Sequence, residues 1–371
     1  MSGKKRLYPY GSTASLRQDV LCVLGVLKVA TADQIRRLTR PEAKNNKSHR
    51  NAALDLQRHG LTLSEGNASN GHKLWGLTPS GLESAASHLG RSMEEMGGIA
   101  RGAARHGATH AMAVNETVLA LMRPGRHAQY IHLGAVGDLA IWKPSSAQPA
   151  ATGIGSLSSW ATEVGLPVSG SWSKPGAGSP RADAVLQALE VGLPLLLVEV
   201  DCGTETTAVI AAKFDKYRRF FRRKVQDTDG RDIPLWQTRW GTTGQEEYQG
   251  HPPVALVFMG VGPRGLRQRM EAVCRLSRGY WSGSMHRTNC GALHYDYRDA
   301  IPILATTLER LQTYGPLGPA WWRYGHTEWE PIHRALGNPA GITVGSGGRW
   351  EEHSEAGVGR MPASAAVPVG D

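Results

Sequence analysis

The sequence predicts a protein of the α+β or α/β class, built from an N-terminal winged helix-turn-helix and a larger α/β unit around a central mixed sheet. The first 90 residues carry helical and strand patterns in winged-helix order, two apolar runs of strand length follow residue 190, and 371 residues exceed one small domain. We expect a basic arm at residues 1–11, the winged helix at 12–90, the α/β unit at 91–335 with a flexible loop near 144–180, and a disordered tail at 336–371.

Two helices are expected to open the N-terminal unit. Apolar residues at helical spacing mark the first helix, over residues 15–29. Thr31 followed by Gln34 has the pattern of a capping box, which predicts a second, short helix from Ala32. Arg40-Pro41 ends that helix, because proline disfavours the helical conformation of the residue before it.

The third helix, expected from Ser48 as its cap to His59, is the candidate recognition helix. Ala52, Ala53 and Leu56 form its buried stripe. In a winged helix, the exposed first turn of this helix meets base edges and phosphates. The candidate DNA-contacting residues there are Lys47, Ser48, Arg50 and Asn51.

A hairpin and a last helix complete the unit. Residues 61–64 and Lys73–Leu77 are strand candidates on either side of a polar, turn-rich loop, and together they predict the wing. From this hairpin Lys73 could reach a backbone phosphate. Thr78-Pro79 is a helix start, with proline at the first helical position.

Positive charge is concentrated in this unit. The net charge of the chain is +10, and residues 1–90 contain thirteen Lys and Arg against six Asp and Glu. Such localised charge favours a polyanionic partner, here double-stranded DNA. Two alternatives remain, because a basic face can simply be solvated and winged helices also serve as protein-interaction modules.

The sequence does not favour several other classes of protein and of functional site. The start of the chain has no apolar stretch of a signal peptide, and the longest apolar runs are too short to span a bilayer, so we expect a cytoplasmic protein without membrane contact. The four cysteines form no CxxC pair of a zinc site. No Walker A motif, dinucleotide-binding fingerprint or serine nucleophile elbow is present.

Acidic residues end two predicted strands of the second unit. Strands are expected at 182–189, 193–200 and 253–260, with a helix from Thr204 or Glu205. Asp183 lies on the first strand, and Glu199 and Asp201 share one face of the next. Clustered carboxylates suit Mg²⁺ or Mn²⁺, so these three acids are the candidate metal ligands, and a nearby Lys would stabilise charge during phosphodiester cleavage.

Simpler roles are also open for these acids. Asp201 could end its strand and cap the following helix, and Glu199 could pair with an arginine such as Arg181. Glu163, after Trp160, could join the cluster. The pair His106 and His110 has a spacing of four but lacks the inner glutamate of HExxH, so the sequence does not favour a metal there.

The stretch 213–224 contains seven basic residues and one acid, with aromatic residues between them. Its outward arginines, represented by Arg218 and Arg222, are candidate phosphate contacts. The alternative is an ordinary solvated helix face.

These features together resemble the replication-relaxation family over residues 12–325. The resemblance rests on the winged helix, the HAMAVNETVLALM helix, Trp160-xx-Glu163, Arg181-x-Asp183-Ala, and Val198-Glu199-Val-Asp201-x-Gly-Thr-Glu205 with Lys213 and Tyr217. It implies a role in plasmid replication and DNA relaxation on mobile elements, with replication or relaxase proteins as partners.

The resemblance also implies a PD-(D/E)xK-type, restriction-endonuclease-like second unit. In that fold an Asp and a (Glu/Asp)-x-Lys on the next strand bind metal and polarise the phosphate. Asp183 and Glu199 match the first two positions, but Asp201 stands where the Lys is expected. Lys213 or Lys216, on the following helix, could supply that cation.

Three functions therefore compete. The leading hypothesis is an accessory factor of replication or mobilisation with a degenerate nuclease-like unit. The alternatives are an active Mg²⁺- or Mn²⁺-dependent endonuclease and a winged-helix transcriptional regulator. If the unit is active, the candidate catalytic residues are Asp183, Glu199, Asp201 and Lys213.

Overall fold

A computed structural model provides the three-dimensional structure of the chain. It describes residues 7–99, 108–122, 131–133, 139–141, 153–189, 192–241, 250–260, 262–287, 293–337 and 361–362. Residues 1–6 of the expected arm at 1–11, and most of the expected tail at 336–371, lie outside the described residues.

The N-terminal unit has the element order that the sequence predicts, with one addition. Its elements are α1 (Ala14–Leu27), β1 (Val29–Thr31), α2 (Ala32–Thr39), α3 (Lys47–Arg58), β2 (Thr62–Asn67), β3 (Lys73–Leu77) and α4 (Pro79–Leu89). The three strands form an antiparallel sheet in the order β1-β3-β2. The addition is β1, whose three residues are too few for a period-two pattern and become a strand only by pairing with β3.

Side-chain caps explain where these helices begin. The Thr31 hydroxyl accepts a hydrogen bond from the Gln34 amide, and the Gln34 side chain accepts one from the Thr31 amide, so the predicted capping box is confirmed. The Thr78 hydroxyl accepts a hydrogen bond from the Gly81 amide and so caps α4, ahead of Pro79. Ser48 does not cap α3. That helix begins at Lys47, so its N-cap is Asn46, which makes no side-chain capping bond.

The larger unit is built on a mixed sheet of seven strands in the order β16-β15-β14-β11-β8-β7-β6. β8 and β14 run parallel to β11, and the other neighbours are antiparallel. The strands are β6 (Trp160–Gly165), β7 (Arg181–Ala188), β8 (Leu193–Asp201), β11 (Val254–Phe258), β14 (Ile303–Thr307), β15 (Trp321–Arg323) and β16 (Trp329–Glu330).

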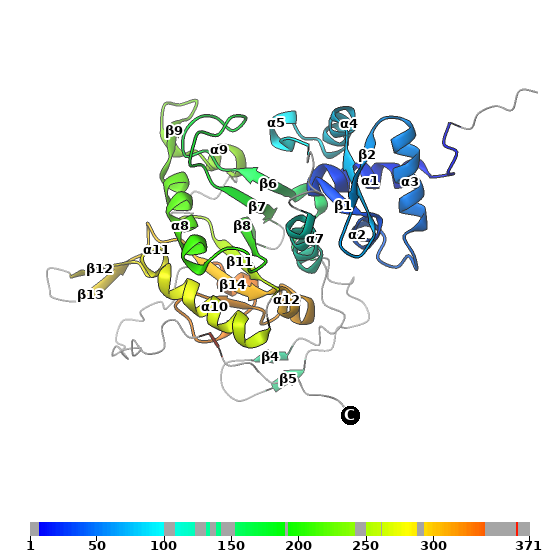
Figure 1. Cartoon of the computed structure of the whole chain (residues 1–371). Helices are drawn as coiled ribbons and strands as arrows, with labels where there is room; N and C mark the ends of the chain where they lie inside the picture. Colours follow the sequence, from blue (N-terminus) through cyan, green and yellow to red (C-terminus); the bar gives the residue numbers. More distant parts are fainter. Residues whose placement is uncertain are drawn as a thin grey trace, which may run out of the picture.

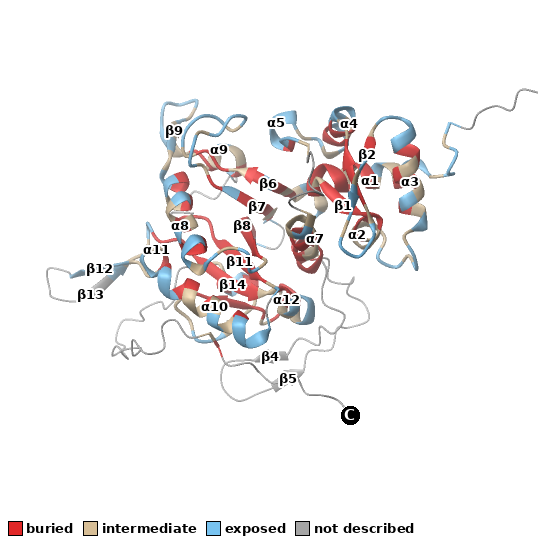
Figure 2. Cartoon of the chain, viewed as in Figure 1, coloured by how far each residue is buried: buried red, intermediate tan, exposed pale blue. Residues whose placement is uncertain are grey.

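Helices cover both faces of this sheet (Figure 1). The helices α8 (Thr207–Arg222), α10 (Pro263–Leu276) and α11 (Arg278–Trp281) pack on one apolar cluster with Leu197 and Phe258. On the opposite face α7 (Ala108–Met122), α12 (Leu308–Tyr314) and α13 (Ile332–Ala335) pack with Leu196 and Val198. Figure 2 shows the strands buried between these layers.

Short elements complete the described chain. They are α5 (Met93–Met96), β4 (Ile131–Leu133), β5 (Leu139–Ile141), η1 (Leu157–Ser159), β9 (Lys224–Gln226), β10 (Asp232–Pro234), α9 (Gln237–Trp240), β12 (Ser284–Arg287) and β13 (Leu293–Asp296). The predicted loop near 144–180 therefore contains a strand, β6. The sequence does not predict this strand, because its flanks are rich in Ser, Gly and Pro. Buried and more exposed residues alternate along it.

The two units share one apolar core. A single cluster runs from Leu24 and Trp75 of the N-terminal unit through Val118 of α7 to Trp160 and Leu196 of the sheet. Polar contacts reinforce it. The Thr162 hydroxyl donates to the Val26 carbonyl at 2.7 Å, and the Asn115 amide donates to the Val29 carbonyl at 2.8 Å. Both donors and both acceptors are thus satisfied at the junction.

Candidate functional site

Three acidic residues are aligned across neighbouring strands of the large sheet. The pairs Thr162 with Ala184 and Val164 with Ala182 set the register of β6 and β7, which puts Glu163 opposite Asp183. The pairing of Ala184 with Val198 similarly puts Asp183 level with Glu199 on β8. Like charges directly opposite each other destabilise a sheet, so each of these acids needs a compensating partner.

Asp183, the central acid, is held by two hydrogen bonds. Its Oδ1 lies 2.9 Å from His110 Nε2, and its Oδ2 accepts the Val200 amide at 2.7 Å. His110 comes from α7, and its Nδ1 lies 3.7 Å from Cys202 Sγ. The hydrogen bond with Asp183, followed by that with Cys202, raises the pKa of His110 to about 10.

The His110–Asp183 pair predicts a specific dependence of stability on pH. The pKa of His110 in the folded chain lies above its ordinary value of 6.5. Its contribution to the free energy of unfolding is therefore complete below pH 6.5 and is lost as the pH rises towards about 10. We expect the melting temperatures of wild type and His110→Ala to converge over this range. A difference that stays constant with pH would contradict the pairing.

Glu199 is almost fully buried, with 4% of its surface exposed. Its Oε1 accepts a hydrogen bond from Tyr217 Oη at 2.5 Å, and its Oε2 lies 3.0 Å from Lys213 Nζ. Burial, and then the charge of Asp183, raises the pKa of Glu199 to about 7. A buried acid with a raised pKa beside a cation is typical of functional sites, although structural ion pairs produce it too.

Lys213 lies between two acids on the helix that follows β8. Besides Glu199, it contacts Glu205 Oε2 at 2.9 Å. Burial by itself would lower the pKa of Lys213, but these two carboxylates outweigh it and raise the pKa. Lys213 therefore keeps its charge beside Glu199. The other candidate, Lys216, is exposed on α8.

Asp201 is placed differently from the other predicted ligands. Both of its carboxylate oxygens accept bonds from the Arg269 guanidinium of α10, and Oδ1 also accepts the Gly203 amide at 3.0 Å. Among the described residues, Asp201 is not part of the group of potential ligands that His110, Glu163 and Asp183 form. It does not cap α8 either, since Thr206 does so, and Arg181 pairs with Glu163 rather than with Glu199.

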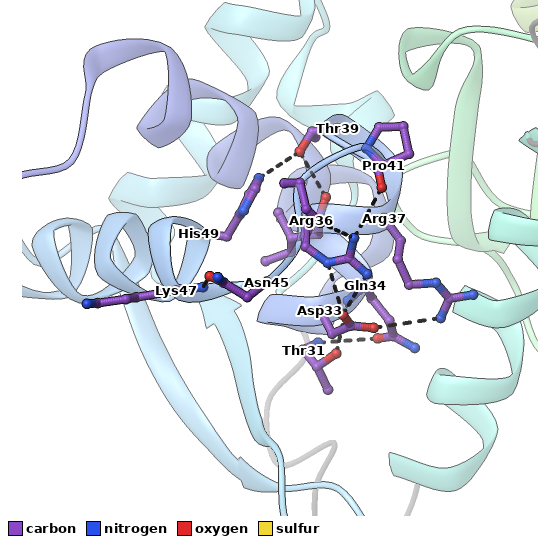
Figure 3. Close-up of polar contacts among 12 residues, drawn as sticks. Thr31, Asp33, Gln34, Arg36, Arg37, Thr39, Pro41, Asn45, Lys47 and His49 are labelled. Carbon is purple, nitrogen blue, oxygen red and sulfur yellow. Dashed lines mark hydrogen bonds and ion pairs between the residues drawn. The ribbon is translucent and has the colours of Figure 1, made fainter. Parts of the chain in front are cut away.

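The predicted recognition helix presents a basic first turn. Lys47 and Arg50 are exposed, whereas Ser48 and Asn51 are partly buried and Asn51 Nδ2 donates to the Tyr10 carbonyl at 3.3 Å. Figure 3 shows Lys47 extending away from the contacts between α2 and α3. Buried His49 fixes α3 on α2, with Nε2 3.1 Å from the Thr39 hydroxyl.

The arginines of α2 make intramolecular contacts instead. Arg36 bonds to Asp33 and to the Pro41 carbonyl, as Figure 3 shows, and Arg37 makes two 2.8 Å contacts with Glu116 of α7. On the β2–β3 hairpin, Lys73 Nζ lies 4.2 Å from the centre of the Trp75 ring. Among the described residues, the first turn of α3 is thus better placed than α2 for an external anion.

Comparison with known families identifies the chain. The replication-relaxation family model matches residues 21–234, which include α3 and the aligned acids. This chain belongs to the replication-relaxation family. No curated protein and no solved structure matches it. No described helix of this replication-relaxation protein is long and apolar enough to cross a membrane.

Two of the predicted phosphate contacts of this replication-relaxation protein lie in ion pairs on α8. Arg218 is 3.6 Å from Asp215 and lies over the Tyr280 ring, while Arg222 pairs with Asp299. Their charge is therefore partly neutralised within the chain.

Sequence reasoning leaves two residues of the site out or undecided. The sequence does not favour His110 as a metal ligand, because the pair of His106 and His110 lacks the HExxH pattern. His106 itself lies outside the described residues. The period of a helix gives no sign that His110 faces Asp183, 73 residues away. Glu163 is only a possible addition from the sequence, and its position is fixed by the pairing of β6 with β7.

Proposed function

We propose that this chain is a DNA-binding accessory protein in the replication or relaxation of a plasmid or mobile element. Its N-terminal unit is a winged helix that binds double-stranded DNA through α3 and the β2–β3 hairpin. Its larger unit is a nuclease-like domain that acts on the DNA backbone. Membership of the replication-relaxation family and the basic N-terminal unit support this role.

The observation that carries the proposal is that Asp183 lies level with Glu199 on the neighbouring strand and that Lys213 contacts Glu199. Two acids on neighbouring strands and one lysine are the groups that metal-assisted phosphodiester cleavage needs. Lys213 reaches Glu199 from α8 and so supplies a cation that the sequence lacks at Asp201. This arrangement favours an active domain over a degenerate one.

The chemistry implies a divalent cation, Mg²⁺ or Mn²⁺. Asp183 fits as its central ligand, because its carboxylate lies between two further acids and its side chain is 13% exposed. Such a cation lowers the pKa of a bound water and neutralises charge on the phosphate. Lys213 would stabilise the charge that develops on the phosphate.

The nuclease role is tested by incubating supercoiled and linear DNA with the full chain and MnCl₂ or MgCl₂. Nicking of supercoiled DNA is expected. Binding without nicking would instead support the degenerate accessory factor. Binding confined to one promoter, with none at an origin or transfer region, would support the regulator.

DNA binding by α3 has its own test. Replacing Lys47 and Arg50 together by Ala should weaken binding and reduce the slope of log affinity against log salt by roughly 0.9 for each phosphate that the variant no longer binds. Fluorescence anisotropy at several salt concentrations measures both. The matched control is Lys174→Ala, an exposed lysine outside both basic stretches. An unchanged slope in the double variant would refute α3 as the DNA-binding helix.

A further inference from the structure

His110, Glu163 and Asp183 bring three potential ligand atoms to one place. One atom from each side chain lies within 4.8 Å of the other two. The residues come from α7, β6 and β7, so three separate elements converge. An ion about 2.1 Å from each ligand tolerates ligand separations up to about 4.2 Å, so a small side-chain rotation would close the cluster.

The distance between His110 and Asp183 already suits a shared ion. Two ligand atoms at about 2.1 Å from a metal, with bonds at right angles, lie about 3 Å apart. His110 Nε2 and Asp183 Oδ1 are 2.9 Å apart. On binding, the ion would replace the proton between them.

Cys202 orients the imidazole ring of His110 for this role. Its sulfur lies 3.7 Å from Nδ1, on the ring edge opposite the Nε2 contact with Asp183. An Nδ1–H that donates to sulfur leaves Nε2 as the free ligand atom. Metal-binding histidines commonly use such a partner on the second nitrogen to fix the ring.

The negative charges of the three aligned acids are not equally balanced by neighbouring groups. Glu199 has Lys213 and Tyr217, and Asp183 has His110. Glu163 contacts Arg181 at 3.4 Å, but the two side chains are 42% and 65% exposed, and such surface pairs contribute little. Glu163 also has a backbone φ of 56°, which is unfavourable for a residue with a side chain. A cation bound beside Asp183 would offset both costs.

We propose that His110, Glu163 and Asp183 coordinate one divalent transition-metal ion, with Mn²⁺ bound in preference to Mg²⁺. One imidazole and two carboxylates form a donor set that suits Mn²⁺ or Zn²⁺, whereas Mg²⁺ prefers oxygen ligands alone. The inference deepens the proposed nuclease role by assigning the cation to the β6 side of Asp183. Glu199 then serves to position Lys213 instead of binding the ion.

The test measures metal binding directly, without DNA. The full chain is titrated with MnCl₂, and free Mn²⁺ is followed by its electron paramagnetic resonance signal, with MgCl₂ as competitor. One bound Mn²⁺ per chain is expected, at least about tenfold weaker in His110→Ala and in Glu163→Gln, since loss of even an outer partner costs that much. His110→Ala should also remove the preference for Mn²⁺ over Mg²⁺.

Two further variants make the outcome decisive. Glu83→Gln, an exposed carboxylate on α4, is the control and should bind Mn²⁺ as wild type does. If Glu199→Gln weakens binding while Glu163→Gln does not, the cation lies on the Glu199 side and the inference is overturned. Absence of Mn²⁺ binding overturns it too. Circular dichroism melts establish that each variant is folded.

The readouts for this inference and for the proposed function are separate. Mn²⁺ bound through His110 and Glu163 in a chain that neither binds nor nicks DNA would keep the metal site and refute the function. DNA nicking whose dependence on Mn²⁺ is unchanged in His110→Ala and Glu163→Gln would support the proposed function and refute the metal site.

Discussion

Replacing Asp183 by Asn is expected to lower the rate of supercoiled-DNA nicking by about 100-fold or more, the loss typical when a preorganised charged group is removed from an active site. Asn keeps the size of the side chain but not its charge. It would weaken the contact with His110 and remove the central ligand of the cation. Single-turnover nicking with saturating MnCl₂ separates this effect from weakened DNA binding.

Two variants sharpen this prediction. Asp215→Asn, on the exposed side of α8, is the control and should nick at the wild-type rate. Asp201→Asn tests whether Asp201 is a catalytic residue, as the sequence predicts. If Asp201 only pairs with Arg269, its variant should lose stability but keep nicking while folded. Nicking by Asp183→Asn at the wild-type rate would contradict the assigned site.

Replacing Trp160 by Ala is expected to reduce the free energy of unfolding by about 3–5 kcal/mol, the usual cost of removing a large buried aromatic side chain. Trp160 is 0% exposed and lies in the apolar cluster that joins the two units. Urea unfolding followed by circular dichroism measures the loss.

Trp160→Phe is the matched control. Trp160 Nε1 has no hydrogen-bond partner among the described residues, so phenylalanine would forfeit volume but no hydrogen bond and should cost less than alanine. Because the core is shared, the wild type should unfold in one transition. A cost for Trp160→Ala below about 1 kcal/mol, or separate transitions for the two units, would contradict a common core.

The helices of the N-terminal unit could be predicted because their signals are local. Thr31 and Gln34 are three residues apart, and so are Thr78 and Gly81, so both partners of each cap lie close together in the sequence. The strand Lys73–Leu77 is predicted with its observed bounds. β1 was missed, since only its pairing with β3 makes it a strand.

For the acidic residues, too, the sequence predicted what depends on local pattern and not what depends on distant partners. The sequence placed Asp183 on one strand and Glu199 on the next, because apolar runs mark buried strands and side chains alternate along them. It also put Asp201 on the face of Glu199, but it could not tell that Arg269, from a distant helix, would take both oxygens of Asp201. Partners 68 residues apart leave no local pattern.

By itself, then, the sequence determined the order of the helices and the hairpin in the N-terminal unit, the basic first turn of α3 and the two strands that carry Asp183 and Glu199. These depend on propensity, capping and periodicity, which act over a few residues. Only the tertiary structure decided that Lys213 reaches Glu199, that His110 and Glu163 join Asp183, and that both units share one core. Strand register and helix docking set those contacts, and both depend on burial of apolar surface by segments far apart in the chain.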